Sequence, residues 1–149
     1  MITLAPNSPA PAFEAIDQHG AGHTLQDYAG KWLLLYFYPK DDTPGCTIEA
    51  CGFRDNFSLL QREIDIVGVS ADSPESHQQF IKKYELPFTL LSDTDRKLIN
   101  TYEATDGGFG KRVSFIIDPK GMIRKIYTGI ECTTHAGEIL KDLHELKNG

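Results

Sequence analysis

The chain is poor in cysteine, with three among 149 residues, and it contains no Cys-x-x-Cys pair. Three cysteines cannot form a structural disulfide framework, so the question becomes what reduced thiols would do. The missing Cys-x-x-Cys argues against a thioredoxin-type dithiol. A zinc site is also disfavoured, because no second close pair of Cys or His completes four ligands. The five histidines are scattered along the chain, and each is expected on the surface.

Long apolar runs and excess positive charge are lacking as well. The longest apolar run, Trp32 to Tyr38, is far too short to span a bilayer. The net charge of -6 argues against nucleic-acid or anionic-membrane partners, because phosphate contacts require clustered Lys and Arg. The N-terminus has no basic region followed by an apolar core of signal-peptide length, so a cytoplasmic location is expected.

The pattern of apolar runs and turn residues predicts one α/β domain covering residues 1–149. Alternation at 13–17, before a glycine-containing turn at 19–22, predicts a short N-terminal β-hairpin. Apolar runs predict five further strands, at 32–38, 64–70, 86–91, 113–118 and 123–127. Capping residues predict four helices: from Thr43 to about Arg62 or Glu63, from Ser73 through Tyr84, from Asp93 or Thr94 to Tyr102, and from Thr133 or Thr134 onward. A flexible loop is predicted at 107–110. This order predicts a mixed central sheet with helices on both faces, compatible with a thioredoxin-like core.

Cys46 stands where a helix is predicted to begin. Thr43 is interpreted as the N-cap and Pro44 as the first helical residue, which places Cys46 in the first turn. There, backbone amides without intrahelical partners and the positive end of the helix dipole favour a thiolate, the nucleophilic form of cysteine.

The charges nearest in sequence oppose such a thiolate, because Asp41 and Asp42 lie close to Cys46. A cation from elsewhere in the fold is therefore required. Arg112 is the best candidate, since it follows the glycine-rich loop and opens a buried strand. The alternative for Arg112 is a strand-end residue in solvent. Arg54, two turns from the cysteine, is interpreted as a structural ion-pair partner.

A second thiol, Cys51, lies five residues after Cys46. Residues five apart in a helix are separated by about 8.6 Å between Cα atoms, whereas a disulfide requires about 4.4–6.8 Å. The two sulfurs cannot join while the helix is intact, so a disulfide between them would unwind part of its first two turns. The alternative is that Cys51 packs as a small apolar residue, and packing is also the expectation for Cys132.

These residues form a familiar pattern. Pro39-x-x-x-Thr43-x-x-Cys46 matches the active-site pattern of peroxiredoxins. Residues 43–55, Thr-Pro-Gly-Cys-Thr-Ile-Glu-Ala-Cys-Gly-Phe-Arg-Asp, closely resemble the bacterioferritin-comigratory, or Q-type, subfamily. The likeness spans most of the chain and includes Lys-Arg-Val-Ser-Phe-Ile-Ile-Asp at 111–118. The resemblance implies a thioredoxin fold and thiol-dependent reduction of hydrogen peroxide and organic hydroperoxides, in antioxidant defence.

The resemblance also implies roles for single residues. Cys46 takes the place of the peroxidatic cysteine and Cys51 that of the resolving cysteine, so that an intrachain disulfide forms between them. Thr43 would hydrogen-bond the thiolate and the peroxide, and Pro39 would shield the pocket. Arg112 takes the place of the arginine that stabilises the thiolate and polarises the peroxide.

A thioredoxin-like dithiol protein is the implied reductant and a monomer the implied assembly. No metal, haem or flavin is implied, because sulfur itself carries the two electrons. Cys132 has no counterpart in these motifs, so its role is open. Two other classes remain in view: a general disulfide oxidoreductase, against which the missing Cys-x-x-Cys counts, and a redox-sensing or chaperone-like module that oxidises once without turnover.

Overall fold

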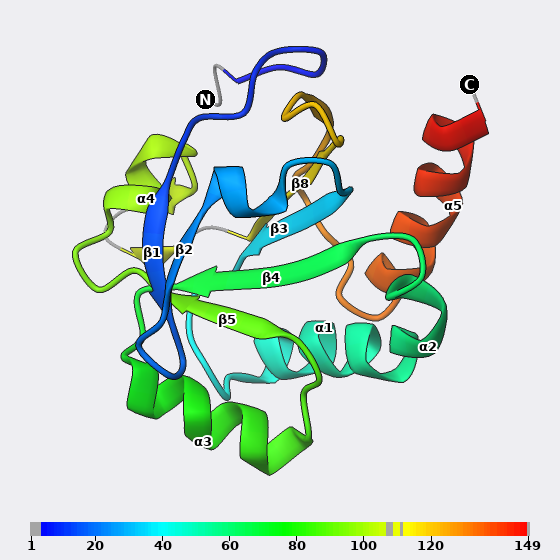
Figure 1. Ribbon diagram of the computed structural model, residues 1–149. Helices are drawn as coiled ribbons and strands as arrows, with labels where there is room; N and C mark the ends of the chain where they lie inside the picture. Colours follow the sequence, from blue (N-terminus) through cyan, green and yellow to red (C-terminus); the bar gives the residue numbers. More distant parts are fainter. Residues whose placement is uncertain (1–3, 107–108, 111, 149) are drawn as a thin grey trace.

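A seven-stranded mixed sheet forms the centre of the computed structural model, which describes residues 4–106, 109–110 and 112–148 (Figure 1). The strand order is β2-β1-β5-β4-β3-β8-β9. The three neighbours β5, β4 and β3 are parallel, and the other adjacent pairs are antiparallel. The strands are β1 (Glu14–Asp17), β2 (Gly22–Thr24), β3 (Leu33–Phe37), β4 (Asp65–Ser70), β5 (Thr89–Ser92), β8 (Val113–Ile117) and β9 (Ile123–Tyr127).

Helices cover both faces of this sheet (Figure 1). In chain order they are the 3-10 helix η1 (Leu25–Tyr28), α1 (Pro44–Asp55), α2 (Phe57–Leu60), α3 (Pro74–Tyr84), α4 (Lys97–Thr101) and α5 (His135–Asn148). A separate two-stranded ladder joins β6 (Thr105–Asp106) to β7 (Phe109–Gly110), where the sequence predicts only a loop. Gly107 and Gly108, the first two residues of the loop predicted at 107–110, lie outside the described residues.

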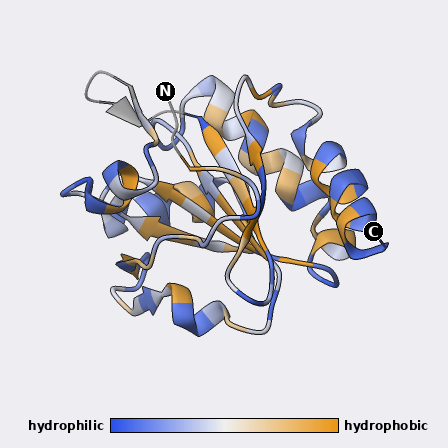
Figure 2. Ribbon diagram, turned by 90° about the horizontal axis from the view of Figure 1, so that it is seen from above, coloured by the Kyte–Doolittle hydropathy of each residue, from blue (hydrophilic) through white to orange (hydrophobic). Residues whose placement is uncertain are grey.

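The central strand β3 is buried on both sides, as its unbroken apolar run predicts. Side chains alternate along a strand, so its even-numbered residues Leu34 and Tyr36, with Tyr38 directly after the strand, pack with α1, α2, α3 and α5. Its odd-numbered residues, Leu33 to Phe37, pack with α4 and the N-terminal segment. Figure 2 shows this apolar centre between polar outer helix faces. Burying each such side chain stabilises the fold by about 1.5–3 kcal/mol. The buried strand β3 therefore holds the start of the following loop, which leads to α1, in a fixed position.

Most predicted elements are confirmed, but one predicted helix is in fact two. The helix that begins after Thr43 ends at Asp55, and α2 comes next as a separate short segment. Asn56 separates them with non-helical backbone angles, and its side-chain amide donates to the Gly52 carbonyl at 2.8 Å. Such local bonds let Asn leave a helix, and the apolar spacing that continues across the break conceals it.

Two other boundaries differ from the prediction. β5 begins at Thr89 rather than Leu86, since Pro87 has no N–H for a sheet ladder. The cap of α4 is Arg96, whose φ is 61°, while the Asp93 carboxylate accepts hydrogen bonds from the amides of Leu98 and Ile99. Among the described residues, no helix has the length and apolarity needed to cross a membrane.

Candidate active site

The site lies where β3 ends and α1 begins. Pro39, half-buried, comes just after the strand, and α1 starts five residues later. β8 runs antiparallel to β3, with Val113 opposite Phe37, so the residue before β8 stands beside the end of β3. That residue is Arg112. Strand register therefore brings together two segments that are 66 positions apart in sequence.

Arg112 joins a thiol to a carboxylate in this site. Its Nη2 donates to the Cys46 Sγ at 3.3 Å, and its Nη1 donates to the Glu49 Oε1 at 2.7 Å. Cys46 is 1% exposed, and the arginine side chain is 21% exposed. The guanidinium thus brings a fixed positive charge to a buried sulfur, at the place where the sequence predicts a cation from elsewhere in the fold.

The start of α1 leaves its first amides available to a ligand. Thr43 has the extended backbone of an N-cap, but its hydroxyl donates to the Lys40 carbonyl at 2.8 Å and caps no helix amide. The first intrahelical bond joins the Thr47 N–H to the Thr43 carbonyl. The N–H groups of Gly45 and Cys46 precede that bond, so they have no intrahelical acceptor and contribute to the positive end of the helix.

Gly45 provides the space in which the guanidinium sits. A Cβ at this position would stand 2.9 Å from Arg112 Nη2, which is closer than real Cβ contacts allow. A side chain here would push Arg112 away from the sulfur. The requirement for glycine thus comes from the close approach of Arg112, since the backbone here is ordinary helix.

Glu49 is a site residue that the sequence patterns did not predict. It lies one turn below Cys46 and is 1% exposed. Burial raises the pKa of its carboxyl to about 7, against the opposing effect of the Arg112 charge and hydrogen bond. Its second oxygen, Oε2, is buried without a hydrogen-bond partner among the described residues. An acidic residue three positions after the cysteine, on the face that must pack against the sheet, was the available signal.

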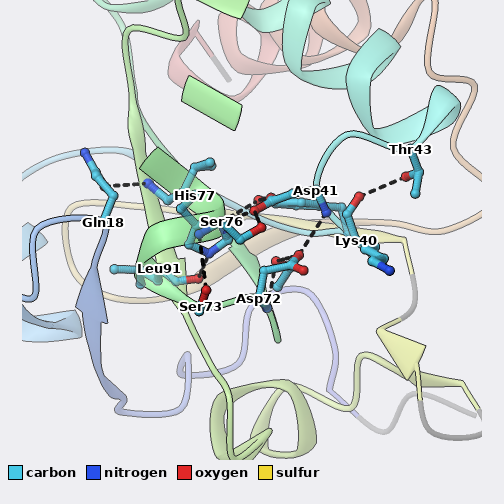
Figure 3. Close-up of polar contacts among 12 residues, drawn as sticks. Gln18, Lys40, Asp41, Thr43, Asp72, Ser73, Ser76, His77 and Leu91 are labelled. Carbon is cyan, nitrogen blue, oxygen red and sulfur yellow. Dashed lines mark hydrogen bonds and ion pairs between the residues drawn. The ribbon is translucent and has the colours of Figure 1, made fainter. Parts of the chain in front are cut away.

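The two aspartates expected to oppose the thiolate are both engaged elsewhere. Asp41 Oδ1 accepts from the Tyr38 hydroxyl at 2.6 Å. Its Oδ2 accepts from the Ser76 hydroxyl at 2.8 Å and lies 2.7 Å from His77 Nδ1 (Figure 3). Asp42 forms an exposed ion pair with Lys83 at 2.8 Å. Hydrogen bonds from Tyr38 and Ser76 to Asp41, and the Lys83 charge beside Asp42, lessen the opposition predicted from sequence.

His77 anchors this network from inside the core. It is fully buried, and its Nε2 faces the Leu91 carbonyl at 2.9 Å while its Nδ1 faces Asp41. Both ring nitrogens therefore lie within hydrogen-bond distance of an oxygen atom. Figure 3 shows the ring between Asp41 and Leu91. The prediction of surface histidines is wrong here and at His135, which is 1% exposed, and the helical spacing of His77 with Phe80 and Tyr84 could have shown it.

This network connects the loop before α1 to neighbouring elements. Its polar atoms are hydrogen-bonded to one another. The Asp41 N–H donates to Asp72 Oδ2 at 2.8 Å, and that oxygen also accepts from the Ser70 hydroxyl. Ligand atoms of Asp41, Asp72 and His77 lie within 4.8 Å of one another. Because hydrogen bonds within the protein already use these atoms, the cluster needs no cation to be satisfied.

The other predicted residues lie around α1. All three cysteines are free thiols, and Cys51 is half-buried on the intact helix, about 140° around its axis from Cys46. Arg54 pairs with Asp55 and donates to the Tyr84 carbonyl, which confirms its structural interpretation. A cavity of about 340 Å³ lies at the opposite end of β3, lined in part by Lys31.

Comparisons with known proteins agree with this geometry. Residues 6–126 match the model of the AhpC/TSA family. Peroxiredoxin Bcp of Bacillus subtilis is 40% identical over 97% of this chain and 98% of its own length. Relatives also include a peroxiredoxin Q of Sedum lineare that is named chloroplastic.

Solved structures of peroxiredoxins have the same fold. A crystal structure of mutant PrxQ from Xylella fastidiosa superposes with a TM-score of 0.91 at 28% identity, covering 97% of this chain and 98% of that one. The bacterioferritin comigratory protein of Xanthomonas campestris, studied for its alkyl peroxide reduction activity, has a TM-score of 0.86 at 30% identity, covering 98% and 99%. The predicted thioredoxin-like fold is confirmed by these matches.

Proposed function

As this chain belongs to the AhpC/TSA family and is a peroxiredoxin of the Bcp/Q type, we propose that Cys46 is the thiol that reduces the peroxide. The observation that supports it most is the contact of Arg112 Nη2 with the Cys46 Sγ, 3.3 Å away, at the start of α1. A buried sulfur that meets a guanidinium and a helix N-terminus together is stabilised as a thiolate, the form that attacks peroxides.

In the first step, the Cys46 thiolate attacks one peroxide oxygen in line with the O–O bond. That bond breaks, the sulfur becomes a sulfenic acid, and the second oxygen leaves as water or an alcohol after taking up a proton. Arg112 and the amides of the first turn of α1 stabilise the charge on the departing oxygen. The Thr43 hydroxyl donates to Lys40, so its oxygen is free to accept from the peroxide O–H. Pro39 covers the pocket from the strand side.

In the second step, Cys51 attacks the sulfenic sulfur and expels water, which leaves an intrachain disulfide with Cys46. The continuous helix from Pro44 to Asp55 holds the two cysteines too far apart for this bond. The first turns of α1 therefore unwind in each cycle. A thioredoxin-like dithiol protein then reduces the disulfide by thiol–disulfide exchange, and α1 re-forms.

The wider assignment comes from the family. The substrates are hydrogen peroxide and organic hydroperoxides, and the role is antioxidant defence. We further propose that the chain works as one domain over residues 1–149 and is located in the cytoplasm. It works as a monomer, because the local cysteine pair permits resolution within one chain.

The test is an intact-mass measurement and thiol count after one equivalent of hydrogen peroxide, on wild type, Cys46→Ser and Cys51→Ser. Wild type is expected to lose two thiols, and Cys46→Ser none. A probe for sulfenic acid that is present when the peroxide is added should trap Cys46 in the Cys51→Ser variant before any other thiol reacts with it. If Cys46 remains a thiol in wild type, Cys46 is not the peroxidatic residue.

Steady-state kinetics separates this proposal from the two other classes. A peroxidase consumes many equivalents of peroxide when thioredoxin and its reductase are supplied. A sensor module would stop after one equivalent, and a general oxidoreductase would reduce insulin disulfides instead.

A further inference from the structure

The third thiol of the chain lies at the same site as Cys46. Cys132 belongs to the loop between β9 and α5 and is half-buried. Its Sγ lies 3.9 Å from the point where a Cβ on Gly45 would stand, and Arg112 Nη2 lies 2.9 Å from that same point. The guanidinium therefore contacts Cys46 on the helix and faces Cys132 across Gly45.

The loop that carries Cys132 lies along one face of α1. Gly45, Glu49 and Gly52 share that face, because helical residues advance by about 100° each. The Cys132 carbonyl oxygen is 3.8 Å from a Cβ placed on Gly52, about two turns beyond Gly45. Cys132 thus packs against α1 from a neighbouring loop and is not part of that helix. Its approach to Cys46 depends on a loop, whereas Cys51 belongs to the same rigid helix as its target.

The charges around Cys132 change when Cys46 is oxidised. Partial burial raises the pKa of the Cys132 thiol, the Arg112 charge lowers it, and the charges of Glu49 and Cys46 raise it further. A Cys46 sulfenic acid is neutral, so one of the effects that keep Cys132 protonated is removed by the peroxide reaction itself. The positive charge of Arg112 is then less compensated, and it favours a thiolate at Cys132.

We propose that Cys132 is a second resolving thiol, which forms a disulfide with the Cys46 sulfenic acid while α1 remains folded. The Cys132 sulfur attacks the Cys46 sulfur, the S–O bond breaks, and the hydroxyl leaves as water with the thiol proton. Cys132 is oxidised and the sulfenic sulfur is reduced, so no other reductant is required. The inference rests on the proposed function, because it needs Cys46 to be oxidised by peroxide first.

The experiment compares Cys51→Ser with the double variant Cys51→Ser, Cys132→Ser after one equivalent of hydrogen peroxide. Peptide mapping of Cys51→Ser is expected to find a Cys46–Cys132 disulfide within one chain, formed at a rate independent of protein concentration. The double variant should keep the sulfenic acid. It should also form at least tenfold more Cys46 sulfinic acid at excess peroxide, since no thiol removes the intermediate. Circular dichroism checks that both variants keep the helical content of wild type.

The outcomes separate the two proposals. If Cys51→Ser accumulates as much sulfenic acid as the double variant, with Cys132 free, the second resolving role is wrong and the peroxidatic role of Cys46 stands. A disulfide that joins two chains, seen as a doubled mass and a concentration-dependent rate, also overturns the role within one chain. If Cys46 stays unoxidised in every variant, the proposed function itself fails.

Discussion

At the scale of single residues, one arginine serves several partners. Arg112 contacts Cys46 and Glu49 directly and faces Cys132 across Gly45. A planar guanidinium presents separate N–H groups, so it can donate to a sulfur and a carboxylate at once. The chemistry of Cys46 therefore depends on everything that fixes the position of this one side chain.

Gly45→Ala should separate activity from stability. The new Cβ would stand 2.9 Å from Arg112 Nη2, so the guanidinium must move away from the sulfur. Losing one well-placed donor costs about 10²-fold in rate, and we expect a fall of roughly 10- to 100-fold in the rate of Cys46 oxidation. Stopped-flow kinetics with hydrogen peroxide measures it.

Gly52→Ala is the matched control. A Cβ there meets only ordinary contacts at 3.8 and 4.0 Å, and both substitutions remove a glycine from α1. Equal rates for the two variants would show that the position of Arg112 does not control the reaction.

Glu49→Gln should remove one pH dependence of stability. The Glu49 pKa is about 7 in the fold and close to 4.5 when unfolded, so between these values the folded chain binds more protons. The contribution of this group to stability therefore falls as pH rises from about 4.5 to about 7, by at most about 1.4 kcal/mol per unit.

Urea unfolding of wild type and Glu49→Gln at several pH values in that window measures the difference. We expect the variant to gain stability relative to wild type as pH rises. Glu145→Gln on the exposed side of α5 is the control and should behave as wild type does. A constant difference between wild type and Glu49→Gln would contradict a raised pKa.

At the scale of elements, the loop between β3 and α1 is held by a buried polar network. Asp41 accepts hydrogen bonds from Tyr38 and Ser76 and contacts the buried His77. These partners belong to the end of β3 and the start of α3. The loop therefore has an anchor on the side away from α1, and this anchor is expected to stay in place during the proposed unwinding of α1.

Asp41→Asn should destabilise the protein by about 3 kcal/mol, because removing one partner leaves the other buried polar groups poorly matched. The Asp42→Asn change is the control. It affects the next residue, an exposed carboxylate that pairs with Lys83, and should have little effect. Urea unfolding at pH 7 compares them. Similar midpoints for the two variants would mean that the network contributes little.

Local patterns predicted which elements exist better than where each one ends. Apolar runs identified the strands, and Ser73 does cap α3, accepting from the Ser76 N–H. The break at Asn56 was missed because it depends on one side-chain bond inside a continuous apolar pattern. Glu49 and His77 were missed because charged or polar types are expected outside, and only the tertiary partners, Arg112 and Asp41, explain their burial.

At the scale of the whole molecule, residues of the candidate site are also part of the packing against the central sheet. The first two turns of α1 carry Cys46, Glu49 and Ala50, all buried against the face of the sheet that α3 and α5 also cover. Unwinding these turns removes packing from the main cluster. The register of β8 against β3, which no local pattern contains, places Arg112, and so the sequence suggested that cation only by its position before a strand.

The disulfide form should melt below the reduced form. A bridge between Cys46 and Cys51 closes a loop of a few residues, so it constrains the unfolded chain little, while the fold loses part of α1. We expect a Tm lower by several degrees, at roughly 2–4 °C per kcal/mol for a chain of this size. Calorimetry of peroxide-treated and reduced wild type measures it. The treated double variant Cys51→Ser, Cys132→Ser is the control, and an oxidised wild type that melts higher would rule out the unwinding.

The boundaries of α1 also limit the time that the helix needs to re-form. Pro44 begins the helix and Asn56 interrupts it at the other end, so in the proposed cycle at most the 12 residues of α1 wind again after reduction. Helical segments of such length relax in about 0.1–1 μs, whereas enzymes typically turn over about 10 times per second. Re-forming the helix thus occupies a negligible fraction of the cycle. In the proposed cycle, the turnover rate is therefore set by the sulfur chemistry and by encounters with the reductant.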